Sequence, residues 1–258
     1  FEKVKNISRE IGGQSAVMTF EPHPIKVMRP GNGPPLITPI NQKLRLISDA
    51  GIDVIFCLPF TKEFASIPAR DFVRDILVGM IGIKEIVVGY DYNFGHGRQG
   101  DTELLRRLGE EMGFKVHIVE PIYIDHTLVS STSIRELVRN GRLAETKKLL
   151  GRDYEISGTV ITGAGRGAKI LGIPTANLLP VDELIPREGI YAVIAVLDGR
   201  EYFGVCNIGH NPTFGVQSLS TETHLLDFHD DIVGRELTIR FIHPLREEKS
   251  FHSPQELA

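Results

Sequence analysis

The sequence has few cysteines and no long hydrophobic run. Its only cysteines, Cys57 and Cys206, lie in short apolar stretches, so buried free thiols are expected rather than a disulfide framework. This usage fits a reducing, cytoplasmic compartment. No stretch approaches about 18 consecutive apolar residues, so we expect neither a membrane span nor a membrane partner. No signal peptide is recognisable, although the sequence starts at Phe1 and not at a methionine.

The sequence also lacks a basic excess. Its formal net charge is −4, and acidic residues concentrate in 151–258, where fifteen acidic residues stand against nine basic ones. A nucleic-acid-binding domain needs clustered basic side chains to contact phosphates. We therefore expect no nucleic-acid partner. An anionic ligand would be held by backbone amides, a few basic side chains or a metal ion.

Two styles of sequence meet near residue 151. Before it, short apolar runs such as Ala16–Phe20 alternate with helical patterns, which predicts an α/β domain with a parallel sheet. The expected helices include 41–50, 69–79 and one that Asp101 caps and that runs to about residue 112. After residue 151, glycine, proline and aspartate separate short strands, which predicts an antiparallel barrel or sandwich. These strands are expected over 156–161, 191–197, 202–208, 223–228 and 236–241. We predict two domains, 1–150 and 151–258, with a helical bridge over 133–150.

A glycine-rich loop follows the first strand of the second domain. Its glycines let backbone N–H groups approach a polyphosphate closely, although the spacing is not that of a Walker A loop. A hairpin loop without a ligand explains the same glycines. The candidate phosphate-binding residues are Gly163, Gly165, Arg166 and Gly167.

Thr175 and Asn177 follow in the sequence Pro-Thr-Ala-Asn. In an extended segment, residues two positions apart point to the same side. Neutral oxygens suit a Mg²⁺ ion that takes its other ligands from phosphates and water. A turn fixed by Pro174 is the structural alternative.

Glu222 begins an otherwise apolar strand. A carboxylate there can accept the proton of an attacking hydroxyl, which is the role of a general base in phosphoryl transfer. An ordinary exposed glutamate at a strand end is the alternative. His224 lies on the same face and is more often structural than catalytic in such a position.

Together these segments resemble the riboflavin kinase family. The resemblance implies a small six-stranded barrel in which Thr175 and Asn177 hold Mg-ATP and Glu222 activates the ribityl 5′-hydroxyl of riboflavin. It also implies that the glycine loop covers the phosphates. The matching stretches are GTVITGAGRGAKILGIPTANL (158–178), GIYA (189–192), NIGHNPTF (207–214), ETHLLDF (222–228), GREL (234–237) and LREEKSF (245–251).

Three motifs of the first domain lie at or near predicted strand ends, where α/β sheets bind ligands. His23 stands between two prolines and either presents its imidazole to a ligand or ends the strand. Asp91 and Phe94 belong to a loop of interleaved aromatic and polar residues, which can hold a flat ring or serve only as a glycine-rich connection.

The third motif opens a helix. Ser131 and Thr132 stand at its start and Arg135 lies one turn in. Free N–H groups, the helix dipole and a guanidinium together make a phosphate site. The same residues also serve as an N-cap, and the two roles do not exclude each other.

Residues 16–150 resemble the FMN adenylyltransferase module that many bacterial riboflavin kinases carry. The resemblance implies that FMN and ATP give FAD and pyrophosphate, with Asp91 and Phe94 near the flavin. It implies an ATP site that contains His23, Ser131, Thr132 and Arg135.

One feature of that module is missing from this sequence. The HxGH motif, whose histidines stabilise the transfer in that family, occurs nowhere here, and Phe1–Ile11 resembles the helix that follows it. We expect the first strand and the HxGH segment to lie outside this sequence. A degenerate module is the alternative.

The sequence is thus identified as a member of the bacterial bifunctional riboflavin kinase/FMN adenylyltransferase (FAD synthetase) family. The expected fold is a Rossmann-like nucleotidyltransferase domain followed by a six-stranded antiparallel barrel. Its ligands would be riboflavin, FMN, ATP and Mg²⁺. Two alternatives stay open: a riboflavin kinase with a catalytically inactive N-terminal domain, and a non-catalytic flavin-binding module. The sequence leaves the oligomeric state open.

Overall fold

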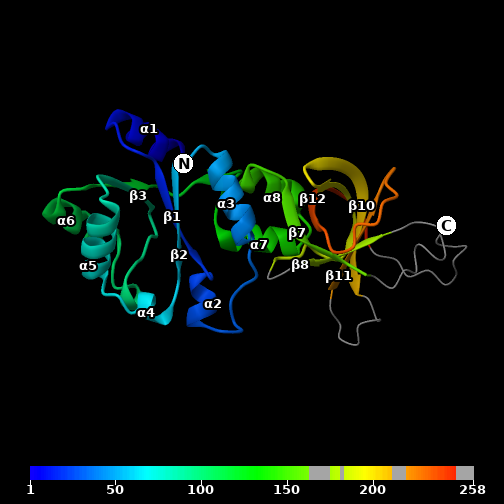
Figure 1. The fold of residues 1–258 in the computed structure, drawn as a ribbon, viewed down its shortest axis with the longest axis horizontal. Coiled ribbons are helices and arrows are strands. Elements are labelled where there is room, and N and C mark those ends of the chain that lie inside the picture. The colour runs from blue at the N-terminus through cyan, green and yellow to red at the C-terminus, as the bar shows by residue number, and fades with distance from the viewer. Residues whose placement is uncertain (163–174, 181–182, 211–218, 248–258) are drawn as a thin grey trace, which may run out of the picture. The chain divides into compact units, whose positions relative to one another are not determined.

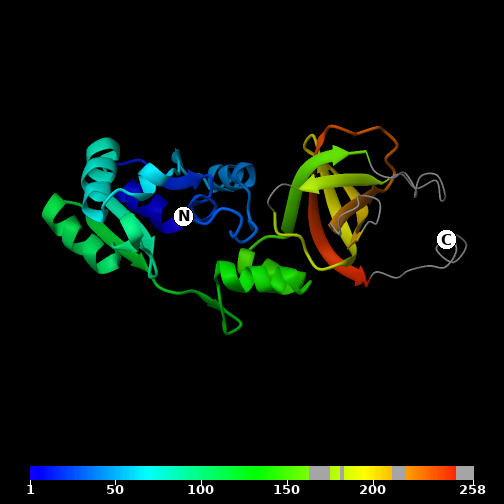
Figure 2. The same ribbon diagram turned by 90° about the horizontal axis from the view of Figure 1, so that it is seen from below.

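The chain divides into two compact units (Figures 1 and 2). In the computed structural model, the described residues are 1–162, 175–180, 183–210 and 219–247. One unit comprises residues 1–34 and 38–122, and the other comprises 35–37 and 123–258. The predicted domain boundary between residues 150 and 151 stays a prediction.

The first unit alternates helices with parallel strands. β1 pairs in parallel with β2, from Ala16 opposite Val54 to Glu21 opposite Pro59, and β3 pairs in parallel with β4. The predicted α/β character is confirmed, in the form of two two-stranded sheets. The elements are α1 (Glu2–Glu10), β1 (Ala16–Glu21), α2 (Pro24–Met28), α3 (Ile40–Asp49), β2 (Val54–Pro59), α4 (Lys62–Ala65), α5 (Ala69–Asp71), η1 (Phe72–Ile81), β3 (Glu85–Gly89), η2 (His96–Arg98), α6 (Thr102–Met112) and β4 (Lys115–Val119).

Local signals set some of the helix ends of this unit. The Asp101 carboxylate accepts a hydrogen bond from the Leu104 N–H at 2.8 Å and so caps α6, as the sequence predicts. The predicted helix over 69–79 differs from the structure, because only its first residues are α-helical and η1 is a π-helix ended by Gly82. Apolar spacing over ten residues does not separate these two helix types.

A chain of aromatic rings builds much of the core of this unit. Phe20 of β1 lies 5.3 Å from Phe64, Phe64 lies 6.1 Å from Phe72, and Phe72 lies 6.0 Å from Phe94, measured between ring centroids. Offset and tilted rings at these spacings attract each other beyond the area that they bury. The rings therefore tie the loop around Phe94 to the rest of the core.

The second unit contains a closed antiparallel barrel of six strands in the order β10-β11-β8-β7-β12-β9, with β9 and β10 closing the ring. The barrel is confirmed, but β8 and the short hairpin of β5 and β6 were not among the strands expected from sequence. The elements are β5 (Tyr123–Ile124), β6 (Thr127–Leu128), α7 (Ser131–Arg139), α8 (Leu143–Leu150), β7 (Tyr154–Ile161), β8 (Ala176–Pro180), β9 (Gly189–Leu197), β10 (Arg200–His210), β11 (Leu219–Leu225) and β12 (Glu236–Arg246).

Strict alternation of burial separates the inside of the barrel from its outside. Along β9 every second residue, from Gly189 to Leu197, is buried. The core also includes Leu137 and Val138 of α7 and Leu149 of α8, so the expected helical bridge packs with the barrel.

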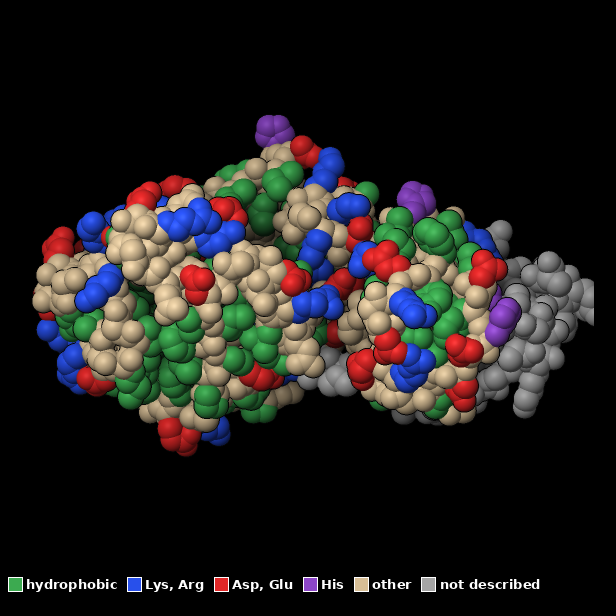
Figure 3. All heavy atoms as spheres, turned by 45° about the horizontal axis from the view of Figure 1, so that its top comes forward, with side chains coloured by type: hydrophobic (Ala, Val, Ile, Leu, Met, Phe, Trp, Pro, Cys, Tyr) green, Lys and Arg blue, Asp and Glu red, His purple; other side chains and the backbone are tan. Residues whose placement is uncertain are grey.

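On the barrel face in Figure 3, acidic and basic side chains are interspersed with hydrophobic ones. No helix within the described ranges is long and apolar enough to cross a membrane.

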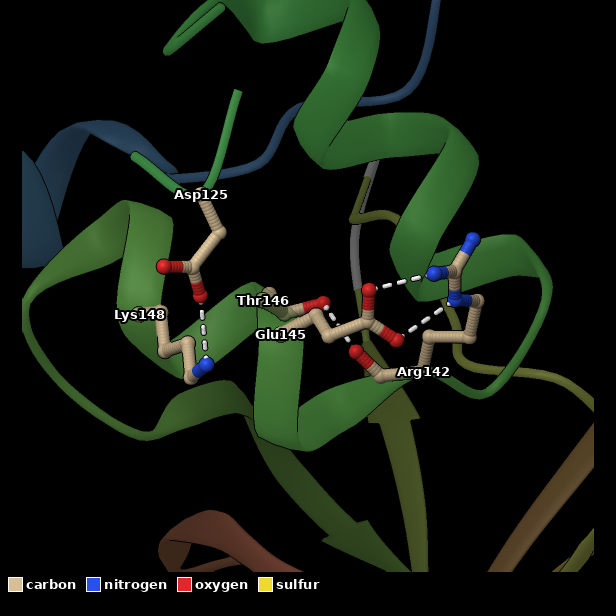
Figure 4. A network of polar contacts seen from close by, with 5 residues as sticks. All are labelled: Asp125, Arg142, Glu145, Thr146 and Lys148. Carbon is tan, nitrogen blue, oxygen red and sulfur yellow. Dashed lines mark hydrogen bonds and ion pairs between the residues drawn. The ribbon is translucent and has the colours of Figure 1, made fainter. Parts of the chain in front are cut away.

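Polar contacts fix α8 at both ends (Figure 4). At its start the Arg142 guanidinium forms two bonds to the Glu145 carboxylate, and the Thr146 hydroxyl donates to the Arg142 carbonyl at 3.0 Å. Near its end Lys148 pairs with Asp125, which lies in the β5–β6 turn. Asp125 has a positive φ of 47°, as a tight hairpin turn requires. Both ion pairs are exposed and screened by solvent, so the Lys148–Asp125 pair orients the hairpin more than it stabilises it.

A short segment from the N-terminal part of the sequence, residues 35–37, belongs to the barrel unit. Leu36 forms a parallel bridge with Glu183, and its carbonyl accepts from the Leu184 N–H at 2.9 Å. Ile37 packs against the barrel core. The Glu183 carboxylate accepts from the Ser157 N–H at 2.9 Å, which links this bridge to β7.

Glu183 is a carboxylate in an unfavourable position. Burial is the main cause that raises its pKa to about 7, and the negative charges of Glu155 and Glu236 add to this, whereas the bond from the Ser157 N–H opposes it. A raised carboxyl pKa costs stability when the group ionises. The contribution of Glu183 to folding is therefore most favourable below pH 4.5 and declines as the pH rises towards 7.

We predict that Glu183→Gln stabilises the protein at pH 8 by roughly 1–3 kcal/mol and has little effect near pH 4.5, because glutamine keeps an acceptor for Ser157 without the charge. Urea unfolding of both proteins at the two pH values measures this difference. Glu136→Gln, at an exposed position of α7, is the control and should show no such pH dependence. An equal effect of Glu183→Gln at both pH values would contradict the prediction.

Candidate functional site

Asn177 and Glu222, which are 45 positions apart in the sequence, are direct cross-strand neighbours in the barrel. Asn177 of β8 stands opposite Glu222 of β11. Their neighbours Ala176 and Thr223 form the next opposed pair and face the core, so Asn177 and Glu222 lie on the outer face of the barrel wall. Side chains opposed in this way lie within contact distance. The structure thus brings together two of the residues singled out from sequence.

The same row continues across the next strands. Glu222 stands opposite Asn207 of β10, Asn207 opposite Ile190 of β9, and Ile190 opposite Arg246 of β12. Asn177 is only 6% exposed. Asn207 was not singled out from sequence, although it lies in the quoted motif NIGHNPTF. Its relation to Glu222 depends on the strand register, which the motif alone does not reveal.

The carboxylate of Glu222 lies near a buried thiol. Burial raises the pKa of Cys206 to about 12, the neighbouring Thr223 hydroxyl opposes this rise, and the charge of Glu222 adds to it. A thiol with so high a pKa carries almost no thiolate at neutral pH. Cys206 is therefore a core side chain behind the row and not a nucleophile.

The possible metal ligands are neutral oxygens. Thr175 comes directly before β8, and its side chain is half-buried. No group of three or more His, Cys, Asp and Glu side chains that could hold a metal occurs in the part of the chain that the structure describes. An ion that shares neutral protein ligands with phosphates and water fits this donor set. Gly163, Gly165, Arg166 and Gly167 lie outside the described residues.

His23 begins a short helix in the first unit. Its Nδ1 accepts a hydrogen bond from the Ile25 N–H at 3.2 Å, and Pro24 follows as the first residue of α2. This is an N-cap geometry, with proline at the position that it favours. A role for His23 in binding ATP stays a prediction.

Ser131, Thr132 and Arg135 belong to α7 in the second unit. The cap itself is Ser130, whose hydroxyl accepts from the Ser133 N–H at 3.1 Å, so Ser131 and Thr132 stand exposed in the first turn. The Nε of Arg135 donates to the carbonyl of Pro35 at 3.0 Å, and burial lowers its pKa. Arg135 thus holds the segment 35–37, a role that the sequence did not indicate.

Asp91 and Phe94 lie in one loop but in different surroundings. Asp91 is exposed, whereas Phe94 is 6% exposed and stacks on Tyr92 at 5.6 Å. The loop is closed by two backbone bonds between Phe94 and Gly100, at 3.0 and 2.9 Å. A Cβ at position 100 would lie 2.6 Å from the Phe94 ring, so only glycine fits beneath it. The structure places Phe94 in the core, and its contact with a flavin stays a prediction.

One cavity of the barrel lies away from these residues. It has a volume of about 310 Å³ and adjoins the turn between β9 and β10, roughly 17 Å or more along the strand from Asn207. Its mixed charges include an ion pair between Arg235 and Asp198. The lining residues are Leu197, Asp198, Arg200, Tyr202, Phe228, Asp230 and Arg235.

Two family models match this chain. The model described as FAD synthetase matches residues 1–133, and the model described as riboflavin kinase matches residues 150–258. The first match covers the first unit and the start of α7, and the second covers the barrel.

Curated relatives match most of the chain. The bifunctional riboflavin kinase/FMN adenylyltransferase of Escherichia coli is 35% identical over 242 residues, which is 93% of this chain and 77% of the relative. The protein of the same name from Pseudomonas fluorescens is 36% identical over 249 residues, 96% of this chain and 79% of the relative. That from Listeria monocytogenes is 35% identical over 259 residues, 99% of this chain and 82% of the relative.

A solved structure shares the fold. The crystal structure of a macrolide-efflux protein from Streptococcus pneumoniae matches with a TM-score of 0.87 and 29% identity, over 99% of this chain and 83% of that one. A shared fold does not carry an activity with it, and the name of that protein implies none for this chain. The family models and the curated relatives agree with each other over nearly the whole sequence, and the chain belongs to the bifunctional riboflavin kinase/FMN adenylyltransferase family.

Proposed function

We propose that this protein makes flavin cofactors in two steps. It transfers a phosphoryl group from ATP to riboflavin, which gives FMN and ADP, and it then joins FMN to the AMP portion of ATP, which gives FAD and pyrophosphate. Family membership over both parts of the chain supports both reactions. Its two free cysteines support a reducing location, the cytoplasm.

The register of Asn177 opposite Glu222 is the observation that carries the kinase assignment. Glu222 is the base that takes the proton of the riboflavin 5′-hydroxyl as that oxygen attacks the γ-phosphorus of ATP. Asn177, with Thr175 before it, holds the divalent cation that accompanies ATP. We assign this cation as Mg²⁺, whose preference for oxygen ligands fits the hydroxyl and amide of these side chains.

When bound, the cation neutralises charge on the phosphates of ATP. The glycine loop that contains Gly163, Gly165, Arg166 and Gly167 contributes backbone amides to the same phosphates. The base and the metal ligands come from adjacent strands of a closed barrel. Rigid strands hold such groups more accurately than loops do, which favours in-line transfer.

The adenylyltransferase assignment uses the other predicted residues. Ser131 and Thr132 present hydroxyls beside the open N–H groups of α7, a position suited to phosphate. Arg135 lies one turn further along, and His23 completes the ATP ligands. Asp91 and Phe94 supply the flavin contacts from their loop.

A second candidate function is riboflavin phosphorylation alone, with a first unit that binds but does not react. The surroundings of two proposed ligands favour it, because Phe94 is packed in the core and Arg135 is bound to the Pro35 carbonyl. A flavin-binding module without catalysis is less well supported, because simple flavin binding requires neither a base nor a metal site.

We predict that the full-length protein, incubated with riboflavin, ATP and Mg²⁺, gives FMN first and FAD later, as separated by liquid chromatography over time. FMN that accumulates without FAD would favour the kinase-only function. If neither product forms, the proposed function is wrong. Samples without Mg²⁺ are the control and should show no turnover.

We predict that Glu222→Gln lowers kcat for riboflavin phosphorylation by roughly 10²- to 10⁴-fold, because the amide cannot accept the hydroxyl proton. Initial rates of FMN formation at saturating substrates measure this effect. Glu201→Gln, a strand carboxylate near the other end of β10, is the matched control and should keep the parent rate. Near-normal turnover of Glu222→Gln would remove this residue from the role of base.

We predict that Asn177→Ala lowers kcat/KM for Mg-ATP by about tenfold or more, equal to at least about 1.4 kcal/mol, and raises the Mg²⁺ concentration needed for half-maximal rate. The KM for riboflavin should stay near the parent value. Asn177→Asp keeps an oxygen ligand and should retain more activity than the alanine variant. An unchanged dependence on ATP and Mg²⁺ in Asn177→Ala would show that the metal lies elsewhere.

A further inference from the structure

Asn207 has a buried polar atom that no residue in the described part of the chain satisfies. Its Oδ1 is buried and has no hydrogen-bond partner among the residues described by the structure. A buried acceptor without a donor destabilises the fold. Proteins keep few such atoms, and a catalytic or binding role is one of the reasons for keeping them. Neither reaction as set out above uses this side chain.

The strand register places Asn207 beside the proposed base. Asn207 of β10 stands opposite Glu222, on the side away from Asn177. Its neighbours along β10, Cys206 and Ile208, are fully buried in the barrel core, so the Asn207 side chain lies on the same outer face as Glu222. Glu222 is therefore flanked by two amides, one on each adjacent strand.

The chemistry of the unsatisfied atom restricts its ligand. An amide oxygen either coordinates a cation or accepts a hydrogen bond. The proposed cation is assigned to Asn177 and Thr175, on the other side of Glu222, so the partner expected for Asn207 supplies an N–H or O–H group. The phosphate oxygens of Mg-ATP are acceptors and cannot do so. The polyhydroxyl side chain of riboflavin offers several donors, and one of its hydroxyls must reach Glu222 for the proposed reaction.

We propose that Asn207 is a substrate-binding residue of the kinase site, whose Oδ1 accepts a hydrogen bond from a ribityl hydroxyl of riboflavin. This inference rests on the proposed kinase function. The acceptor substrate then lies on the Asn207 side of Glu222, and the nucleotide with its cation lies on the Asn177 side. The two reactants thus approach the base from opposite sides.

The test is Asn207→Leu, assayed for FMN formation over a range of riboflavin and Mg-ATP concentrations. We expect kcat/KM for riboflavin to fall roughly 10- to 100-fold, the equivalent of one buried hydrogen bond, with KM for Mg-ATP unchanged. The melting temperature should stay equal or rise, because replacement of an unsatisfied polar group by an apolar one removes a cost.

A second measurement separates binding of the hydroxyl chain from a general change in the site. Lumiflavin has the flavin ring but a methyl group in place of the ribityl chain, and its inhibition constant should be the same for Asn207→Leu and the parent. If lumiflavin binding weakened by the same factor as kcat/KM for riboflavin, the proposal would be overturned, because Asn207 would then only shape the barrel. Unchanged riboflavin kinetics would overturn it too, and so would a change confined to Mg-ATP.

Two further variants guard against a folding defect. Asn207→Asp keeps the shape and the acceptor oxygens and should discriminate riboflavin from lumiflavin as the parent does; loss of that discrimination counts against the proposal. Val205→Ala lies on the same strand and face, two residues from Asn207, and should leave the riboflavin kinetics unchanged. If the parent protein itself forms no FMN, the proposed function and this inference both fail. If the parent forms FMN and Asn207→Leu matches it, only this inference fails.

Discussion

The candidate kinase site depends on the closed backbone ladder of the barrel. β11 is held on one side by β8 and on the other by β10, and the ring continues until β9 meets β10 again. Side chains alternate between the two faces of a strand, so a slip of one residue would turn Glu222 into the core and Thr223 out of it. Closure removes free edges and makes such a slip costly, because every neighbouring pair would have to shift with it.

Hydrophobic burial joins the helices between the two family matches to the barrel unit. Residues 134–149 fall between the matched ranges, yet Leu137, Val138 and Leu143 lie in the barrel core. The segment 35–37 joins this unit as well, through the bridge to Glu183 and the bond from Arg135. What reads in the sequence as a connector is therefore part of the hydrophobic core, and the units of folding do not end where the regions of sequence similarity end.

The sequence predicts elements wherever a local signal decides the structure. The aspartate before α6 and the alternating residues of β9 are such signals, and both elements are found as expected. The π-helical form of η1 was not predictable, because apolar spacing over ten residues does not distinguish it from an α-helix. Asn177 and Glu222 were recognised from motifs, whereas Asn207 was missed, since only the pairing of β10 with β11 places it beside Glu222.

The row on the barrel wall also suggests why amides flank the proposed base. A cation on an adjacent strand would attract the carboxylate into an ion pair and compete with the incoming hydroxyl for it. The two direct cross-strand neighbours of Glu222 are instead neutral, and the nearest basic residue in the row, Arg246, is separated from it by Asn207 and Ile190. Neutral amides can still recognise opposite partners, because the oxygen of one can bind a cation and the oxygen of the other can accept from a hydroxyl. In the proposed site, two asparagines on different strands would thus bind different substrates. Asn177 would bind the cation of Mg-ATP, and Asn207 would accept from a hydroxyl of riboflavin.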